Sequence, residues 1–167
     1  MRLFERFASQ LIKISERRSP DFIVGGTTNP YLCRWHLIPR NRFFNVYLHH
    51  FLRSDEDRAL HDHPWASVSI ILRGAYLEHL PRKIWRLRKA GNIVIRDAKT
   101  AHRIELFNPE SWPLVSVFCP YLLDPCWTLF ITGPRLRAWG FHCPKGWVPW
   151  QDFTAPGAEG EIGKGCE

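Results

Sequence analysis

The sequence predicts an all-β fold, an antiparallel sandwich or barrel, preceded by one amphipathic helix. Eight Trp and eleven Phe in 167 residues suit a β-rich domain with an aromatic-lined interior. Ten short strand-like segments follow Pro30, and turns carrying Pro, Gly or Asp separate most of them, without intervening helical repeats. These segments are 31–38, 44–53, 66–73, 75–80, 84–88, 92–96, 101–107, 113–119, 127–132 and 137–142.

The chain length predicts one domain, because 167 residues can bury a single core. We assign residues 1–30 to the helix and a polar connector, 31–154 to the β-domain, and 155–167 to a flexible tail rich in Gly and acidic residues. Apolar residues recur at helical spacing within residues 3–15, with charged residues between them. We expect this helix to dock on the domain or on a second subunit, in preference to a membrane surface.

The net charge of +7, with a pI near 9.5, favours anionic partners. The densest basic run is 82–89, which we interpret as an exposed hairpin with a solvated basic face; a nucleic-acid surface is the less favoured alternative. No apolar stretch approaches the roughly 18 residues that a membrane span needs, so no membrane partner is expected.

The cysteine pattern predicts reduced thiols in a cytoplasmic protein. The five cysteines include no CxxC pair, and their number is odd. The N-terminal residues also lack the pattern of a secretory signal. The cysteines are Cys33, Cys119, Cys126, Cys143 and Cys166.

Three histidines form a candidate metal site. His61 and His63 lie in the run Leu60-His61-Asp62-His63-Pro64-Trp65, and on an extended segment alternate side chains share a face. His102 on an adjacent strand completes three neutral imidazoles around a divalent ion. Such a site leaves coordination positions open, as a catalytic centre requires.

Two glycines lie in register with these histidines, and together they resemble the two motifs of the cupin superfamily. In the first motif an H-x-H pair precedes a glycine, which matches His61, His63 and Gly74. In the second motif a histidine follows a glycine by 11 residues, which matches Gly91 and His102. The resemblance covers residues 55–106 directly.

The chain departs from those motifs at several positions. Asp55 replaces the first glycine, and Ser67 replaces the metal-binding glutamate of the first motif. Asp97, Lys99 and Leu106 replace the Pro, Gly and Asn of the second motif. Because a serine hydroxyl is a poor ligand for a divalent ion, the resemblance implies a site of three histidines without a carboxylate.

The resemblance implies a cupin-like double-stranded β-helix, a jelly-roll barrel that commonly dimerises. A three-histidine site is similar to that of the thiol dioxygenases, so Fe(II) is the first expected metal, with Zn, Ni, Co or Mn as alternatives. The implied function is a dioxygenase acting on a small anionic or thiol-containing substrate. Two alternatives stay open: a non-catalytic module that binds a small ligand, and a metal-free sugar-nucleotide epimerase-like isomerase with His63 or His102 as the base.

Charged residues near the histidines supply further candidates. Arg73 shares the histidine face by strand parity, and Arg53 and Arg34 lie on neighbouring strands, so each is a candidate for binding an anionic group. Glu78 is a candidate to orient a ligand imidazole or to act as a base. Arg73 and Glu78 are therefore the candidate catalytic residues.

Strand parity also predicts which other side chains face the pocket. Ser67 and Ser69 share the face of His63, while Ile104 and Leu106 share that of His102. Of the pair His49 and His50 only one can point inward, and we considered His50 as a partner or additional ligand, with a plain histidine favoured. The aromatic segment 139–150 is interpreted as a plug at one end of the barrel, with closure of the pocket over substrate as the alternative.

Overall fold

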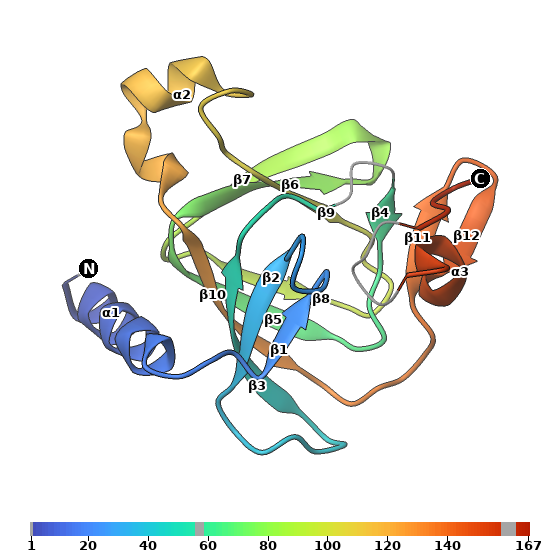
Figure 1. Cartoon of the computed structure of the whole chain (residues 1–167), viewed down its shortest axis with the longest axis horizontal. Coiled ribbons are helices and arrows are strands. Elements are labelled where there is room, and N and C mark those ends of the chain that lie inside the picture. Colours follow the sequence, from blue (N-terminus) through green and yellow to red (C-terminus); the bar gives the residue numbers. More distant parts are fainter. Residues whose placement is uncertain (1, 56–58, 158–162) are drawn as a thin grey trace.

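The computed structural model describes residues 2–55, 59–157 and 163–167 (Figure 1). The helices are α1 (Arg2–Glu16), η1 (Pro81–Lys83), α2 (Pro113–Phe118), η2 (Pro120–Leu123) and α3 (Trp150–Thr154). The strands are β1 (Phe22–Val24), β2 (Leu32–His36), β3 (Asn45–Phe51), β4 (Leu60–His61), β5 (Ser67–Arg73), β6 (Ala75–Leu80), β7 (Ile84–Lys89), β8 (Ile93–Arg96), β9 (Arg103–Leu106), β10 (Cys126–Thr132), β11 (Gly140–Cys143) and β12 (Gly146–Pro149).

Two antiparallel sheets enclose the main core. One has the order β1-β2-β3-β10-β5-β8 and the other the order β7-β6-β9. The core cluster takes Leu32, Phe51 and Ile71 from the first sheet and Tyr76 and Ile104 from the second, so the two sheets pack face to face. A third sheet, β12-β11-β4, lies with α3 at one end of this barrel (Figure 1).

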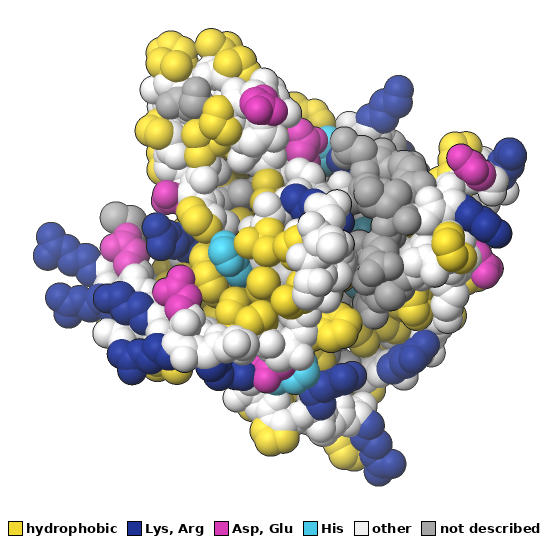
Figure 2. All heavy atoms as spheres, in the orientation of Figure 1, with side chains coloured by type: hydrophobic (Ala, Val, Ile, Leu, Met, Phe, Trp, Pro, Cys, Tyr) yellow, Lys and Arg dark blue, Asp and Glu magenta, His cyan; other side chains and the backbone are white. Residues whose placement is uncertain are grey.

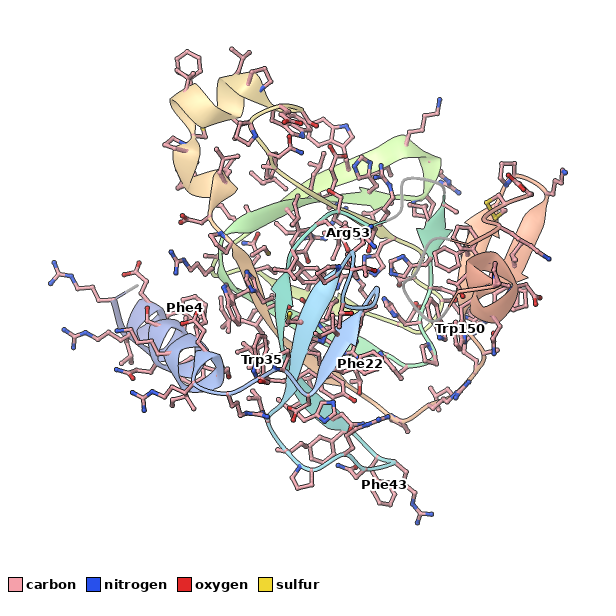
Figure 3. All side chains as sticks on the ribbon, in the orientation of Figure 1. Phe4, Phe22, Trp35, Phe43, Arg53 and Trp150 are labelled. Carbon is pink, nitrogen blue, oxygen red and sulfur yellow. A yellow bond between two sulfur atoms is a disulfide. The ribbon has the colours of Figure 1, made fainter. Side chains whose placement is uncertain are left out.

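Helix α1 packs on the outside of the six-stranded sheet, as the amphipathic pattern predicted. Its buried residues Ala8 and Ile12 join a cluster with Trp35, Leu48 and Trp127. The indoles of Trp35 and Trp127 stack with ring centroids 5.4 Å apart, and Trp35 lies between α1 and the barrel in Figure 3. None of the described helices is long and apolar enough to cross a bilayer.

The secondary structure differs from the prediction in two segments. Residues 113–119 are not a strand, because Pro113 begins α2 and Pro120 begins η2, and a proline has no N–H for a strand ladder. The predicted connector before Pro30 contains β1, whose residues Phe22–Val24 pair with β2. Three residues are too few to show a period-two pattern, so the sequence did not reveal this strand.

The C-terminal segment is joined to the third sheet by a disulfide, contrary to the expectation of reduced thiols. A disulfide joins Cys143 on β11 to Cys166, so the prediction that all five cysteines are reduced is wrong. Disulfides are rare in the cytoplasm, which removes the thiol argument for that location. Within the predicted flexible tail, the Gly165 N–H donates to the Phe153 carbonyl at 2.9 Å, which joins residues 163–167 to α3.

The two motif glycines occupy different environments. Both have left-handed backbone, with φ of +71° at Gly74 and +91° at Gly91. A Cβ at Gly74 would lie 2.5 Å from the Asp124 carbonyl oxygen, whereas a Cβ at Gly91 would meet nothing within 4 Å. Gly74 is therefore required for a close backbone approach, and Gly91 only for its conformation.

We expect Gly74→Ala to cost clearly more stability than Gly91→Ala. The Gly91 variant carries the left-handed strain alone, about 1–2 kcal/mol, whereas the Gly74 variant adds a clash with backbone that cannot rotate away. Urea unfolding of the two variants beside wild type measures the difference. Equal losses would show that the β5–β6 turn yields to a methyl group.

Candidate metal centre

A backbone bridge brings the three histidines together. His61 ends β4, His63 follows it, and His102 precedes β9. His61 and His102 exchange both N–H···O bonds of an isolated antiparallel bridge, each at 2.9 Å. Because His63 lies two residues beyond His61, its side chain returns to the same face, and the two motifs meet at one point.

The imidazole nitrogens of His61, His63 and His102 form a set suited to one ion. One ring nitrogen from each lies within 4.8 Å of the other two. The Nε2 atoms of His63 and His102 are 2.9 Å apart. Two ligands bound at about 2.1 Å with an angle near 90° are separated by about this distance, so these two nitrogens already suit a shared metal.

Burial favours the neutral, ligand form of the His63 and His102 imidazoles. It lowers the pKa of His63 well below the ordinary value, and the neighbouring His61 and His102 lower it further. Burial likewise lowers the pKa of His102 to about 4, against an opposing effect of Glu78. Both rings are therefore neutral near pH 7 and can offer a nitrogen lone pair.

A buried carboxylate lies behind His102. Glu78 on β6 is 1% exposed, and its Oε1 is 3.4 Å from the Nδ1 of His102. This contact is long for a hydrogen bond, so the carboxylate orients the ring mainly by its charge. It favours a proton on Nδ1 and leaves the Nε2 lone pair turned towards His63. Glu78 is thus placed to orient a ligand, one of the two roles considered for it.

Two arginines keep Glu78 ionised. Arg96 Nε donates to its Oε1 at 2.8 Å, and Arg88 Nε donates to its Oε2 at 2.7 Å. Burial by itself would raise the pKa of Glu78, but His102 and the charge and hydrogen bonds of Arg96 outweigh it and lower that pKa well below its ordinary value. An ionised carboxylate, paired with two arginines, therefore lies behind the candidate metal site.

Asp55 is a site residue whose role the sequence did not indicate. Its Oδ2 accepts the Ile104 N–H at 2.6 Å and lies 3.8 Å from His61 Nδ1. The side chain thereby joins the loop before β4 to β9 and places a carboxylate near a second ligand. Its position in place of the first cupin glycine was the available signal.

Asp62, between the paired histidines, was also missed. Period two turns it away from them, and it is 1% exposed. Its carboxylate accepts the Gly140 N–H at 3.0 Å and the Trp147 Nε1–H at 3.1 Å, and pairs with Arg137 at 2.8 Å. The Nε2 atom of His142 lies 3.1 Å from Asp62 Oδ2, so His142 is a further hydrogen-bond partner of Asp62. Asp62 thereby fixes the H-x-H segment to the third sheet.

The aromatic segment 139–150 closes one side of the site. The rings of Trp139 and Phe141 lie 6.3 and 5.8 Å from that of His61. Trp139 stacks on Trp150 at 5.8 Å, and Phe141 stacks on Phe153 at 3.6 Å. The segment is therefore both a packed aromatic end of the barrel and a wall of the pocket, which joins the two interpretations.

The histidines line a cavity of about 140 Å³. Its walls are mostly apolar, and Arg34, Arg53 and Arg96 are the arginines among its lining residues. Arg73 is not among them: it is exposed at the end of β5, where a register shift opposite Trp127 interrupts the alternation. The parity argument that placed Arg73 on the histidine face was wrong for this reason.

Strand parity correctly predicted some of the other side chains that line the cavity. Ser69 and Ile104 line the cavity, whereas Ser67 is buried without lining it, and Leu106 packs against the core. His49 points inward and lines the cavity. His50 points outward and stacks on Trp127 with ring centroids 4.2 Å apart, so it is a plain packing residue and not a ligand.

Comparison with solved structures supports the fold. The chain is similar to the DMSP lyase DddQ from Ruegeria pomeroyi, with a TM-score of 0.51 and 15% identity over 78% of this chain; it spans 61% of the length of that protein. It is also similar to a double-stranded β-helix protein from Klebsiella pneumoniae, with a TM-score of 0.47 and 16% identity over 71% of this chain and 90% of the other. A putative mannose-6-phosphate isomerase from Ralstonia eutropha gives a TM-score of 0.49 and 11% identity over 68% and 93%.

The predicted cupin-like double-stranded β-helix is therefore confirmed as the fold of this chain. No protein-family model matches the sequence, and no curated protein is significantly similar to it. At identities of 10–16% the structural likeness establishes the fold alone.

We expect Glu78→Gln to weaken metal binding by roughly ten- to a hundredfold, because the neutral amide no longer fixes the Nδ1–H tautomer of His102. Isothermal titration with Zn or Co measures the affinity. Arg88→Gln is the matched control, since it removes a partner of Glu78 without touching His102. Equal metal affinity in wild type and Glu78→Gln would contradict the orienting role.

We also expect the metal-free protein to lose stability as the pH falls from 6.5 towards 4. The pKa of buried His102 is lower in the folded state than in the unfolded state, so the unfolded chain takes up the proton first and acid favours unfolding. Urea midpoints between pH 7 and pH 4 measure the slope. His102→Gln should have a shallower slope than wild type, and an identical slope would exclude this histidine as its source.

Proposed function

We propose that this chain is a metal-dependent enzyme, in which His61, His63 and His102 hold one divalent ion beneath a pocket for a small anionic or thiol-containing substrate. Fe(II) is the proposed metal and oxygenation the proposed reaction. The observation that carries the proposal is the convergence of three imidazoles on one point of the cavity, with the charge of Glu78 behind one of them. When bound, iron would supply the Lewis-acid and redox chemistry of a non-haem centre.

The aromatic walls support a reaction shielded from water. Trp139 and Phe141 cover the side of His61, and Phe130 lies 6.3 Å from the ring of His63. An apolar enclosure strengthens the electrostatic interactions of a charged substrate with the groups that hold it. These side chains would also exclude bulk water from a reactive intermediate.

Arg34 is the proposed binding residue for the anionic group. Its Nε donates to His49 Nε2 at 2.9 Å, and its guanidinium lies 4.9 Å from the centre of the Tyr47 ring. Burial lowers the pKa of His49 well below the ordinary value, so this imidazole is a neutral acceptor that orients the guanidinium without competing for the anion. Arg53 also lines the pocket, but it donates to the Ser54 and Asn29 carbonyls at 3.2 and 3.4 Å.

The size of the cavity favours a small substrate. A volume of about 140 Å³ is close to that of a cavity that holds one benzene-sized molecule. A whole sugar nucleotide, with its base, ribose, diphosphate and hexose, does not fit inside this volume, so an epimerase-like isomerase would bind part of its substrate outside the cavity. A non-catalytic module that binds the same small anion remains the second candidate.

The experiment must also distinguish oxygenation from lyase activity. DddQ, whose fold this chain shares, is described as a DMSP lyase. An elimination would need the metal and the anion-binding arginine but would consume no O2.

Location in the cytoplasm, a homodimer, and the absence of a nucleic-acid partner stay predictions.

The first experiment measures metal content by plasma mass spectrometry, on wild type and His102→Ala, after reconstitution with Fe(II). One iron per chain, lost in the variant, is the expected result. The reconstituted protein is then screened for O2 uptake with small thiol acids and carboxylic acids. Metal binding without O2 uptake or elimination would favour the non-catalytic module, and no metal in wild type would end the proposal.

Arg34→Gln tests the substrate side of the same site. We expect it to lose activity or ligand binding while keeping one metal per chain, because Arg34 lies on β2 and not among the ligands. Arg53→Gln is the control, since its contacts to backbone carbonyls assign it mainly to the fold. Retained activity in Arg34→Gln would exclude this arginine as the anion-binding residue.

A further inference from the structure

Helix α1 carries a second apolar line that the barrel does not cover. Its inner face packs on the six-stranded sheet through Ala8 and Ile12, yet Leu3 is 81% exposed, Phe7 54% and Ile14 58%. Positions 3, 7 and 14 fall on one side of a helix, because their spacing returns near a whole number of turns. Three large apolar side chains on this side of α1 therefore face solvent, with the exposed Gln10 between Phe7 and Ile14.

A line of positive charge runs beside these apolar side chains. Arg2, Arg6 and Lys13 each precede one of the three apolar residues, so they repeat the same spacing one position earlier. All three are exposed. A helix with basic residues bordering its apolar face is typical of segments that lie in the interface of an anionic membrane.

A second apolar surface lies on α2 and η2. Leu114 is 71% exposed, Val117 69%, Phe118 76% and Tyr121 57%. This segment projects from the barrel in Figure 1, and its hydrophobic side chains gather at the tip in Figure 2. Four large apolar side chains within eight residues form an exposed patch of the kind that marks an interaction surface.

Both elements project on the side of the barrel away from β11, β12 and α3 (Figure 1). We propose that this side binds peripherally to an anionic lipid surface. The apolar tip of α2–η2 would enter the acyl boundary, and α1 would lie in the headgroup region with Arg2, Arg6 and Lys13 against the lipid phosphates. This proposal departs from the sequence-based expectation of no membrane partner, and it is independent of the metal site.

Shape and charge favour lipid over other occupants. The α2–η2 tip is convex, so a protein partner would need a matching groove, whereas fluid lipid chains can rearrange around it. A second copy joined by a two-fold axis through α1 would bring two lines of like charge together. Nucleic acid would satisfy the basic residues but would leave Leu114, Val117 and Phe118 in water.

Flotation of the full chain with vesicles tests the proposal. The probes are vesicles of phosphatidylcholine alone and of phosphatidylcholine with about one third phosphatidylserine. We expect binding to the anionic vesicles only, weakened by high salt because exposed charges are screened. Absence of binding to the anionic vesicles, or equal binding to both kinds, would overturn the proposal.

Two double variants locate the surface. Arg6→Glu with Lys13→Glu, and Leu114→Ser with Phe118→Ser, should each reduce binding by roughly tenfold or more. The matched controls are Arg86→Glu on β7 and Ile95→Ser on β8, where Arg86 is exposed and Ile95 is 78% exposed; both should bind like wild type. Equal loss in the controls would overturn the assignment.

Analytical sedimentation without lipid tests the alternative that the α2–η2 patch binds a second copy of the chain. A monomer in wild type and in the Leu114→Ser, Phe118→Ser variant supports the lipid surface. A dimer that this variant abolishes would assign the patch to a second copy of the chain and would overturn the proposal. Near-native circular dichroism of each variant shows that lost binding does not arise from unfolding.

Discussion

The buried carboxylate of Glu78 connects the two sheets of this barrel to its candidate metal site. It lies on β6 and contacts Arg88 on β7, Arg96 on β8 and, at 3.4 Å, the Nδ1 of His102. β8 belongs to the six-stranded sheet and β6 and β7 to the smaller one, so these contacts span the interior between the sheets. Removing the Glu78 carboxylate would leave the buried charge of Arg96 without its acidic partner, at a cost of about 3–5 kcal/mol.

Three acidic side chains lie close to the histidine segments without joining the candidate ligand set. Glu78 lies behind His102, Asp55 lies 3.8 Å from His61, and Asp62 turns to the third sheet. Each carboxylate is neutralised by arginine or backbone N–H groups before it could reach an ion. The three imidazoles therefore form the candidate ligand set, while the acids hold them in position.

The spacing of the motif residues predicted much of the centre. His61 and His63 share a face because strand side chains alternate, and the glycines at 74 and 91 mark left-handed turns that only glycine adopts easily. The prediction that Arg73 faces the histidines was wrong because a register shift near Trp127 interrupts the alternation of side chains on β5. Such a shift depends on how two strands pair, and neither strand encodes it alone.

The sequence by itself determined the all-β fold and the amphipathic first helix, and it singled out the three histidines that the structure brings together, because strand and helix periodicity are local properties of the chain. Only the tertiary structure decided that Asp55, Asp62 and Glu78 support those histidines, that Cys143 pairs with Cys166, and that α2 stands where a strand was expected. These outcomes depend on contacts between residues far apart in sequence, which arise only when the sheets close on one another.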